Sequence, residues 1–245
     1  MVNVLNLFTP FTPQTAKINA RISKPECVIG EYFQLELDIL SGNIEQHISS
    51  IKTQVDCYLE DVNATTKTEK TTITSYQLEK NIVLSPNTKI SQSYDLYLPL
   101  DSPITMPGCR FEVSTSICHA NEAVYQDRIS IYAQPNKLLA AWFSCLAKLN
   151  LKQSNYWIAD RHNRTHFNFA YQQKYRYINM GSSELPNKFF IIFSYESYPD
   201  YLDINIDLQK SNYRSSQESF RITITNQNNH DLREILIKQI KEFTN

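Results

Sequence analysis

The sequence has little glycine and no long hydrophobic run. Only 4 of its 245 residues are glycine, so we expect no long flexible linker. No window approaches the roughly 18 apolar residues that a membrane-spanning helix needs, so we expect no membrane span. The GxGxxG, P-loop and GxSxG motifs are also missing. Their absence excludes the common nucleotide-binding loops and the nucleophile elbow of hydrolases.

Cysteine is present in an odd number and without CxxC spacing, which argues against a disulfide framework and a structural zinc site. We therefore predict a reducing, cytoplasmic compartment. Cys118 and His119 are adjacent, so their side chains point to opposite faces of a strand and cannot form a thiol–imidazole pair. We interpret Cys118 as a buried structural residue. No catalytic residues are predicted, and we expect the protein not to be an enzyme. The five cysteines are Cys27, Cys57, Cys109, Cys118 and Cys145.

The two ends of the chain differ in character. Residues 1–15 contain apolar residues and prolines without a preceding basic region, so we interpret them as an N-terminal arm and not as a signal peptide. Acidic residues are in excess over residues 1–135 and basic residues over 136–245. This asymmetry is either ordinary scatter or a sign that the halves attract each other or that the second half meets an anionic surface.

Alternating hydrophobicity dominates residues 16–135. The longest example is residues 44–60, where Ile51, Val55 and Leu59 are among the apolar residues that occupy every second position. Such a strand needs a second sheet over its apolar side. Further strands are predicted over residues 16–22, 31–40, 71–84, 89–98, 111–117 and 129–132. The pattern predicts a mainly β protein whose first domain, residues 16–135, is an antiparallel sandwich.

The period changes after Gln134. Leu138, Trp142 and Leu146 recur at helical spacing, which predicts an amphipathic helix over about 137–149 with Asn136 as its N-cap. The second domain, residues 136–245, is then predicted to be β-rich and to end with a second helix over about 231–243. Its strands are predicted at residues 167–171, 189–195, 201–208 and 220–225.

Two alternative sites occur in the second half. Asp160, His162 and His166 have the only metal-like spacing, but His162 and His166 lie about 13 Å apart in an extended segment, so they cannot share one zinc ion. Tyrosines accompany Lys174, Arg176 and Arg214 and suggest a stacking surface for single-stranded nucleic acid. Half-exposed sheets carry the same residues, so we expect neither metal nor nucleic acid. The tyrosines are Tyr156, Tyr171, Tyr175, Tyr177, Tyr195, Tyr198, Tyr201 and Tyr213.

Two segments resemble a known family. Residues 16–60 are similar to the opening strands of the bacterial sporulation-control proteins of the stage-zero M type, including Gly42, Glu45 and Ile48 after the turn. Residues 98–108 resemble the proline-bounded Pro-Ile-Thr loop of that family. The resemblance implies a fold of two arrestin-like β domains and a scaffold that acts through protein contacts. A sporulation role would follow only in a spore-forming organism.

We therefore predict a non-enzymatic, cytoplasmic adaptor or regulatory protein without a cofactor. Its partner is expected to be a protein, because exposed strand edges and loops on a rigid sandwich commonly carry recognition. The alternative is a ligand-binding or metal-dependent protein that uses a cleft between the domains through Asp160, His162 and His166. The predicted partner contacts are Lys17, Asn19, Arg21, Asp101, Ser102, Ile104 and Thr105.

Overall fold

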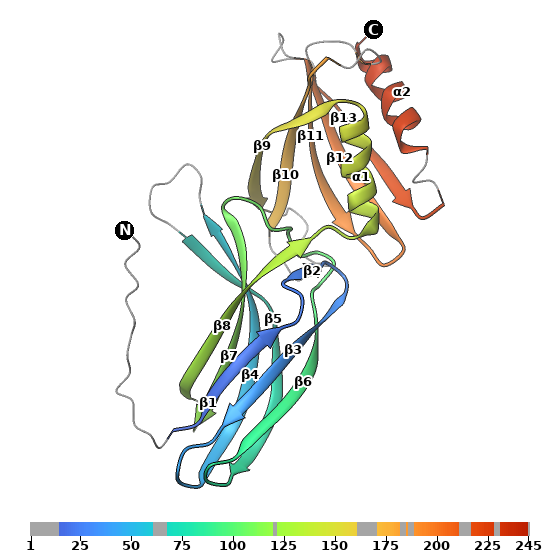
Figure 1. Ribbon diagram of the computed structural model, residues 1–245. Helices are drawn as coiled ribbons and strands as arrows, with labels where there is room; N and C mark the ends of the chain where they lie inside the picture. Colours follow the sequence, from blue (N-terminus) through green and yellow to red (C-terminus); the bar gives the residue numbers. More distant parts are fainter. Residues whose placement is uncertain are drawn as a thin grey trace.

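The chain forms two halves that lie end to end (Figure 1). The first half contains strands β1 to β8, and the second contains helix α1, strands β9 to β13 and helix α2. Of residues 160, 210 and 244 only the backbone is described. The computed structural model describes residues 15–60, 68–119, 122–160, 171–181, 185, 189–210, 217–227 and 231–244.

The first half is a sandwich of two sheets. One sheet has three strands in the order β1-β3-β6, and the other has five in the order β2-β8-β7-β4-β5. The strands are β1 (Lys17–Ile22), β2 (Glu26–Val28), β3 (Tyr32–Leu40), β4 (Gln46–Glu60), β5 (Thr68–Leu84), β6 (Lys89–Tyr97), β7 (Cys109–His119) and β8 (Glu122–Gln134).

Strand β4 lies between β7 and β5 in the five-stranded sheet and confirms the predicted burial pattern. Ile51, Val55 and Cys57 are completely buried, and the opposite layer contributes Leu35 and Leu37 from β3. Alternate residues of a strand point to opposite faces, so one side of each sheet supplies the core. The strands therefore form because hydrophobic side chains recur at every second position.

Strand β2 was not predicted, because it has only three residues and follows Pro25 directly. It pairs in parallel with β8, with Cys27 opposite Ala133. The backbone N–H of Tyr132 donates to the carbonyl of Pro25 over 2.7 Å, so the chain continues along β8 after β1 ends. This parallel pair is an exception to an otherwise antiparallel arrangement of the described strands.

The second half is one antiparallel sheet with two helices on one face (Figure 1). The strand order is β13-β12-β11-β10-β9. Both helices were predicted, and Asn136 caps α1 by accepting a hydrogen bond of 3.0 Å from the N–H of Leu139. The elements are α1 (Lys137–Lys148), β9 (Leu151–Asp160), β10 (Tyr171–Asn179), β11 (Phe189–Ser197), β12 (Tyr201–Lys210), β13 (Gln217–Thr225) and α2 (Leu232–Thr244).

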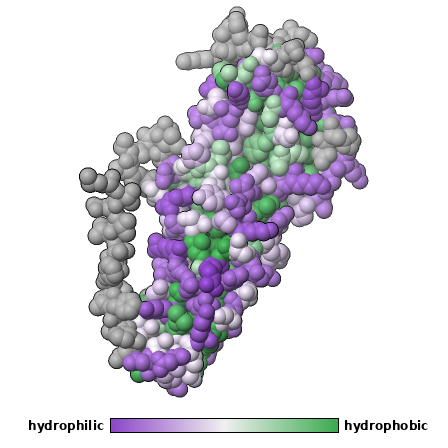
Figure 2. All heavy atoms as spheres, in the orientation of Figure 1, coloured by the Kyte–Doolittle hydropathy of each residue, from purple (hydrophilic) through white to green (hydrophobic). Residues whose placement is uncertain are grey.

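The core of the second half lies between this sheet and the helices. Trp142 of α1 is completely buried, and its ring meets Phe193 of β11 edge-on at 5.4 Å. Tyr175 stacks on Phe193 at 5.0 Å between ring centroids. Figure 2 shows hydrophobic residues gathered along the middle of the molecule and hydrophilic ones along its outline. The predicted mainly β class with two amphipathic helices is confirmed.

Candidate functional site

The predicted contacts on β1 lie on the outer face of the three-stranded sheet. Asn19 and Arg21 are exposed and Lys17 is half-buried, whereas Ile18 and Ala20 between them are buried in the core. Strand β1 is at one edge of its sheet. Its backbone is not open throughout, because the N–H of Ala20 donates to a carboxylate oxygen of Asp127 over 2.9 Å.

A buried carboxylate organises this outer face. Asp38 of β3 is only 6% exposed, and its Oδ1 accepts a hydrogen bond of 2.6 Å from Ser91. Its Oδ2 lies 3.0 Å from the Nζ of Lys89 and 3.0 Å from a guanidinium nitrogen of Arg21. We call Arg21, Asp38, Lys89 and Ser91 the Asp38 cluster. It fixes side chains from all three strands of the sheet in one arrangement.

Hydrogen bonding determines the charge state of the Asp38 cluster. The hydroxyl of Ser91 and the ammonium of Lys89 hold the pKa of Asp38 below its usual value, and Arg21 adds to the effect. Each of these groups favours the ionised carboxylate, which outweighs the opposing effect of desolvation. Asp38 is therefore an anion at neutral pH. The face therefore presents two cations, Arg21 and Lys89, around a carboxylate whose oxygens already contact Ser91, Lys89 and Arg21.

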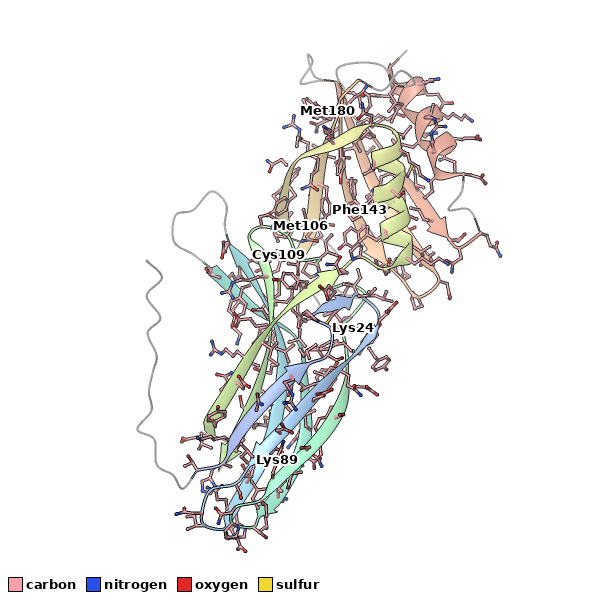
Figure 3. All side chains as sticks on the ribbon, viewed as in Figure 1. Lys24, Lys89, Met106, Cys109, Phe143 and Met180 are labelled. Carbon is pink, nitrogen blue, oxygen red and sulfur yellow. The ribbon has the colours of Figure 1, made fainter. Side chains whose placement is uncertain are left out.

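The predicted proline loop occupies a different position, at the junction between the two halves. Figure 3 shows Met106 and Cys109 of this region beside the second half. Ser102 is completely buried, Ile104 is 8% exposed, and Asp101 and Thr105 are half-buried. Thr105 is also tied to β8, because its N–H donates to the carbonyl of Ala133 over 2.9 Å.

A glutamine joins the halves through this loop. Gln173 of β10 is 3% exposed, its Nε2 donates to the carbonyl of Ile104 over 2.8 Å, and its Oε1 accepts from the N–H of Ile104 over 2.9 Å. The hydroxyl of Tyr175 also donates to this Oε1, over 2.7 Å. We call this arrangement the Gln173 clasp. Nothing in the sequence around Gln173 distinguishes it from an ordinary strand residue.

The other predicted sites fall partly outside the described residues. His162 and His166 lie outside them altogether, and only the backbone of Asp160 is described, at the end of β9. Tyr175 is completely buried and Tyr177 is 8% exposed, so the suggested tyrosine surface for nucleic acid does not form at these positions. Both rings pack against Phe193 in the core.

The cysteines are buried and unbridged. All five are free thiols, and Cys118 is 4% exposed, as predicted for a structural residue. Burial raises the pKa of Cys27 and of Cys145 to about 11. The Sγ atoms of Cys57 and Cys109 lie 3.7 Å apart, and their mutual hydrogen bond, with burial, raises the pKa of Cys57. Thiols with raised pKa values are poor nucleophiles at neutral pH.

Two other kinds of site have no candidate within the described ranges. No three His, Cys, Asp or Glu side chains gather there in a way that suits a metal ion. No helix in this part of the chain is both long and apolar enough to cross a membrane. Neither result adds a functional residue.

Among solved structures, the sporulation control protein Spo0M from Bacillus subtilis matches with a TM-score of 0.75 and 16% identity, covering 94% of this chain and 99% of that chain. At this identity the match shows a shared arrestin-like fold. Two others score far lower: an alkylpurine DNA glycosylase from Pseudomonas fluorescens (TM-score 0.28, 15% identity, 48% of this chain and 30% of that one) and a β-glucosidase from Listeria innocua (0.27, 16%, 48% and 16%). Similarity at that level supports no conclusion about this chain.

Of the two sequence comparisons, the one with protein families points in the same direction. No match was found among curated protein sequences. The family described as "Spo0M: SpoOM protein" matches residues 9–190, which is well over half of the chain. This match includes both segments in which the sequence resembles sporulation-control proteins. The chain therefore belongs to the Spo0M family, and this membership supports a regulatory role.

Proposed function

We propose that this protein is a non-enzymatic adaptor that acts in the cytoplasm by binding another protein through the outer face of β1, β3 and β6. The observation that carries the proposal is the Asp38 cluster, which holds charged side chains of three strands in one fixed arrangement. Arg21 remains about half exposed there, with a side-chain exposure of 53%. Charged groups that are already ordered lose less entropy when a partner binds.

The individual contacts of this proposal differ in accessibility. Lys17, Asn19 and Arg21 project from the outer face and would meet the partner directly. From the proline loop, Asp101 is the acidic residue that a partner would reach, because Ser102 and Ile104 are buried. Ile104 and Thr105 would contribute by positioning the loop.

The proposal includes the organisation of the chain. We divide it into a domain over residues 16–135 that supplies the binding face and a second domain over 136–245 that the Gln173 clasp attaches. Sporulation control, the role that the Bacillus subtilis protein is named for, is the proposed process for a spore-forming host.

Site-specific photo-crosslinking in living cells tests the proposal. A benzophenone amino acid at Asn19 would lie on the outer face of β1, and the same amino acid at Lys52 would lie exposed on β4 of the other sheet. We expect a crosslinked protein adduct from position 19 and none from position 52. Equal adducts at both positions, or none at position 19, would contradict the proposed face.

A further inference from the structure

The sheet of the second half has a face that the described helices do not cover. Tyr175 and Phe193 point toward α1, since both contact the ring of Phe143. Side chains alternate along a strand, so the neighbours of these residues point away from the helices. Lys174 pairs with Ser194 and Arg176 with Ile192 across β10 and β11, which places these four residues on the opposite face.

This opposite face is partly accessible over its β9–β11 part, although Ser194 within it is only 7% exposed. Trp157 of β9 lies opposite Lys174, and Lys152 lies opposite Ile178. Lys152 is exposed, and Trp157, Lys174, Arg176, Phe190 and Ile192 are all half-buried, as expected of a sheet face without a second layer. We define the open face as Lys152, Trp157, Lys174, Arg176, Phe190 and Ile192.

Among the residues that the structure describes, the cations of the open face have no acidic partner. The ion pairs among the described residues do not involve Lys152, Lys174 or Arg176. The Nε atom of Arg176 is buried and has no hydrogen-bond partner, and the guanidinium carbon lies 3.8 Å from the ring centroid of Phe190. The positive charge of this face is therefore uncompensated within the described part of the chain.

Carboxylates on the same sheet are used elsewhere. Asp203 of β12 accepts a hydrogen bond of 2.6 Å from Thr223 of β13, and Asp207 accepts one of 2.6 Å from Ser219. These cross-strand bonds hold both aspartates toward the β13 edge of the sheet. The face thus has a cationic part with aromatic residues and an acidic part, which includes Glu196 of β11 opposite Asp203; the carboxylate of Glu196 accepts a hydrogen bond of 3.3 Å from Tyr198.

We propose that the open face binds an acidic segment of a partner protein that also carries apolar side chains. Carboxylates of the segment would meet Lys152, Lys174 and Arg176, and its apolar side chains would meet Trp157 and Ile192. Complementary charge selects the partner, and apolar contact with aromatic residues supplies affinity. The inference rests on the proposed adaptor function and names the chemistry of a partner at a second surface.

Single-stranded nucleic acid fits this face less well. Such ligands bind where successive bases stack on free aromatic rings along a cationic groove. Here Arg176 covers the ring of Phe190, so Trp157 is the one aromatic ring of the open face that remains for stacking.

The two tryptophans of the chain allow a direct test. The probe is a short fluorescein-labelled peptide of glutamate and leucine, compared with a lysine–leucine peptide and with oligothymidylate. Nuclear magnetic resonance follows the indole N–H signals, because Trp157 lies on the open face and Trp142 is completely buried. We expect the acidic peptide to shift the Trp157 signal and to leave the Trp142 signal in place.

Charge reversal supplies the matched variants. Lys174→Glu with Arg176→Glu should weaken binding of the acidic peptide about tenfold or more, because two favourable charge contacts become repulsive. Lys148→Glu with Lys238→Glu changes the net charge equally but lies on the helices, and it should leave binding unchanged. Thermal unfolding checks that both variants fold, and Lys174→Gln alone provides a milder change if the double variant does not.

Specific outcomes would overturn the inference. These are a Trp157 signal that does not respond to the acidic peptide, equal binding by the two double variants, and binding of oligothymidylate in place of the peptide. Failure of this test leaves the crosslinking result at Asn19 unaffected, because that position lies on β1 in the other half. Failure at Asn19 with a positive peptide result would instead reject the β1 face and keep the open face.

Discussion

At the scale of single residues, Asp38 shows how local contacts determine a charge. Ser91 and Lys89 lower its pKa, so the folded protein binds this proton more weakly than the unfolded chain does. A group of this kind stabilises the fold above its unfolded pKa, near 4, and loses that contribution as pH falls toward the folded pKa. The contribution of Asp38 should therefore be complete at neutral pH.

We predict that Asp38→Asn lowers the free energy of unfolding at pH 7, and that its difference from the parent protein shrinks as pH falls below about 4. The asparagine keeps the size of the side chain but removes the charge that faces Arg21 and Lys89. Urea unfolding of both proteins at several pH values measures this. Asp95→Asn, at an exposed position of β6, is the control. A difference that stays constant with pH would show that ionisation of Asp38 does not stabilise the fold.

The burial of Asp38 could not be predicted from the sequence. Alternation correctly places Asp38 on the outer face of β3, but it predicts exposure there. Arg21 and Lys89 cover Asp38. They come from β1 and β6, and the sequence does not show that these strands are the neighbours of β3. Asp56 of β4 is a second example, completely buried on an outer face beside Lys70 at 2.9 Å. Periodicity assigns a face to a residue, whereas its exposure depends on long side chains from adjacent strands.

At the scale of elements, each edge of the three-stranded sheet is contacted at one residue by a side chain of the opposite sheet. The hydroxyl of Tyr76 on β5 donates to the carbonyl of Tyr97 over 2.8 Å and accepts from its N–H over 2.9 Å. At the other edge, Asp127 accepts from the N–H of Ala20. Unpaired strand edges are templates for aggregation. Each of these contacts occupies backbone groups of one edge strand and so hinders pairing with another chain there.

We predict that Tyr76→Phe destabilises the protein by about 1 kcal/mol, because the loss of one hydroxyl leaves both backbone groups of Tyr97 without this partner. It should also increase self-association through the edge of β6. Chemical denaturation measures the first effect, and light scattering during storage at high concentration measures the second. Tyr132→Phe removes a hydroxyl from a side chain that is 51% exposed and serves as the control. Equal behaviour of the two variants would mean that the Tyr76 contact is not protective.

Elements differed in how readily the sequence revealed them. The long strands of the sandwich were predicted because apolar residues occupy every second position along them, as in β4. Strand β9 was missed, since it is an edge strand whose first part, including Lys152 and Asn155, is exposed on both faces. Strand β10 was also missed over most of its length, because its inward residues are Gln173, Tyr175 and Tyr177 instead of aliphatic ones. Without an apolar alternation neither strand has a recognisable period.

At the scale of the whole molecule, the change of period near Gln134 predicted where α1 begins, but not how the halves meet. The proline loop was predicted to be displayed for recognition. Its backbone is instead bonded to Gln173 in the second half. Such contacts join residues that are distant in sequence and use backbone groups, so composition and spacing carry no signal for them. The Gln173 clasp is one contact between the halves, and the hydrogen bond from the hydroxyl of Tyr171 on β10 to Glu69 on β5 is another.

The last prediction concerns this clasp. Gln173→Ala should destabilise the protein by about 2 to 4 kcal/mol, because the N–H and carbonyl of Ile104 and the hydroxyl of Tyr175 lose a partner and each buried orphan costs about 1 to 3 kcal/mol. Gln173→Glu still accepts from Ile104 N–H as a carboxylate, but it donates to the Ile104 carbonyl only when protonated. Its defect relative to the parent protein should therefore decrease as pH falls, whereas that of the alanine variant should not. Hydrogen exchange at the Ile104 amide, read together with the radius of gyration from X-ray scattering, measures both variants. Full protection of that amide in Gln173→Ala would show that the halves are joined by other contacts.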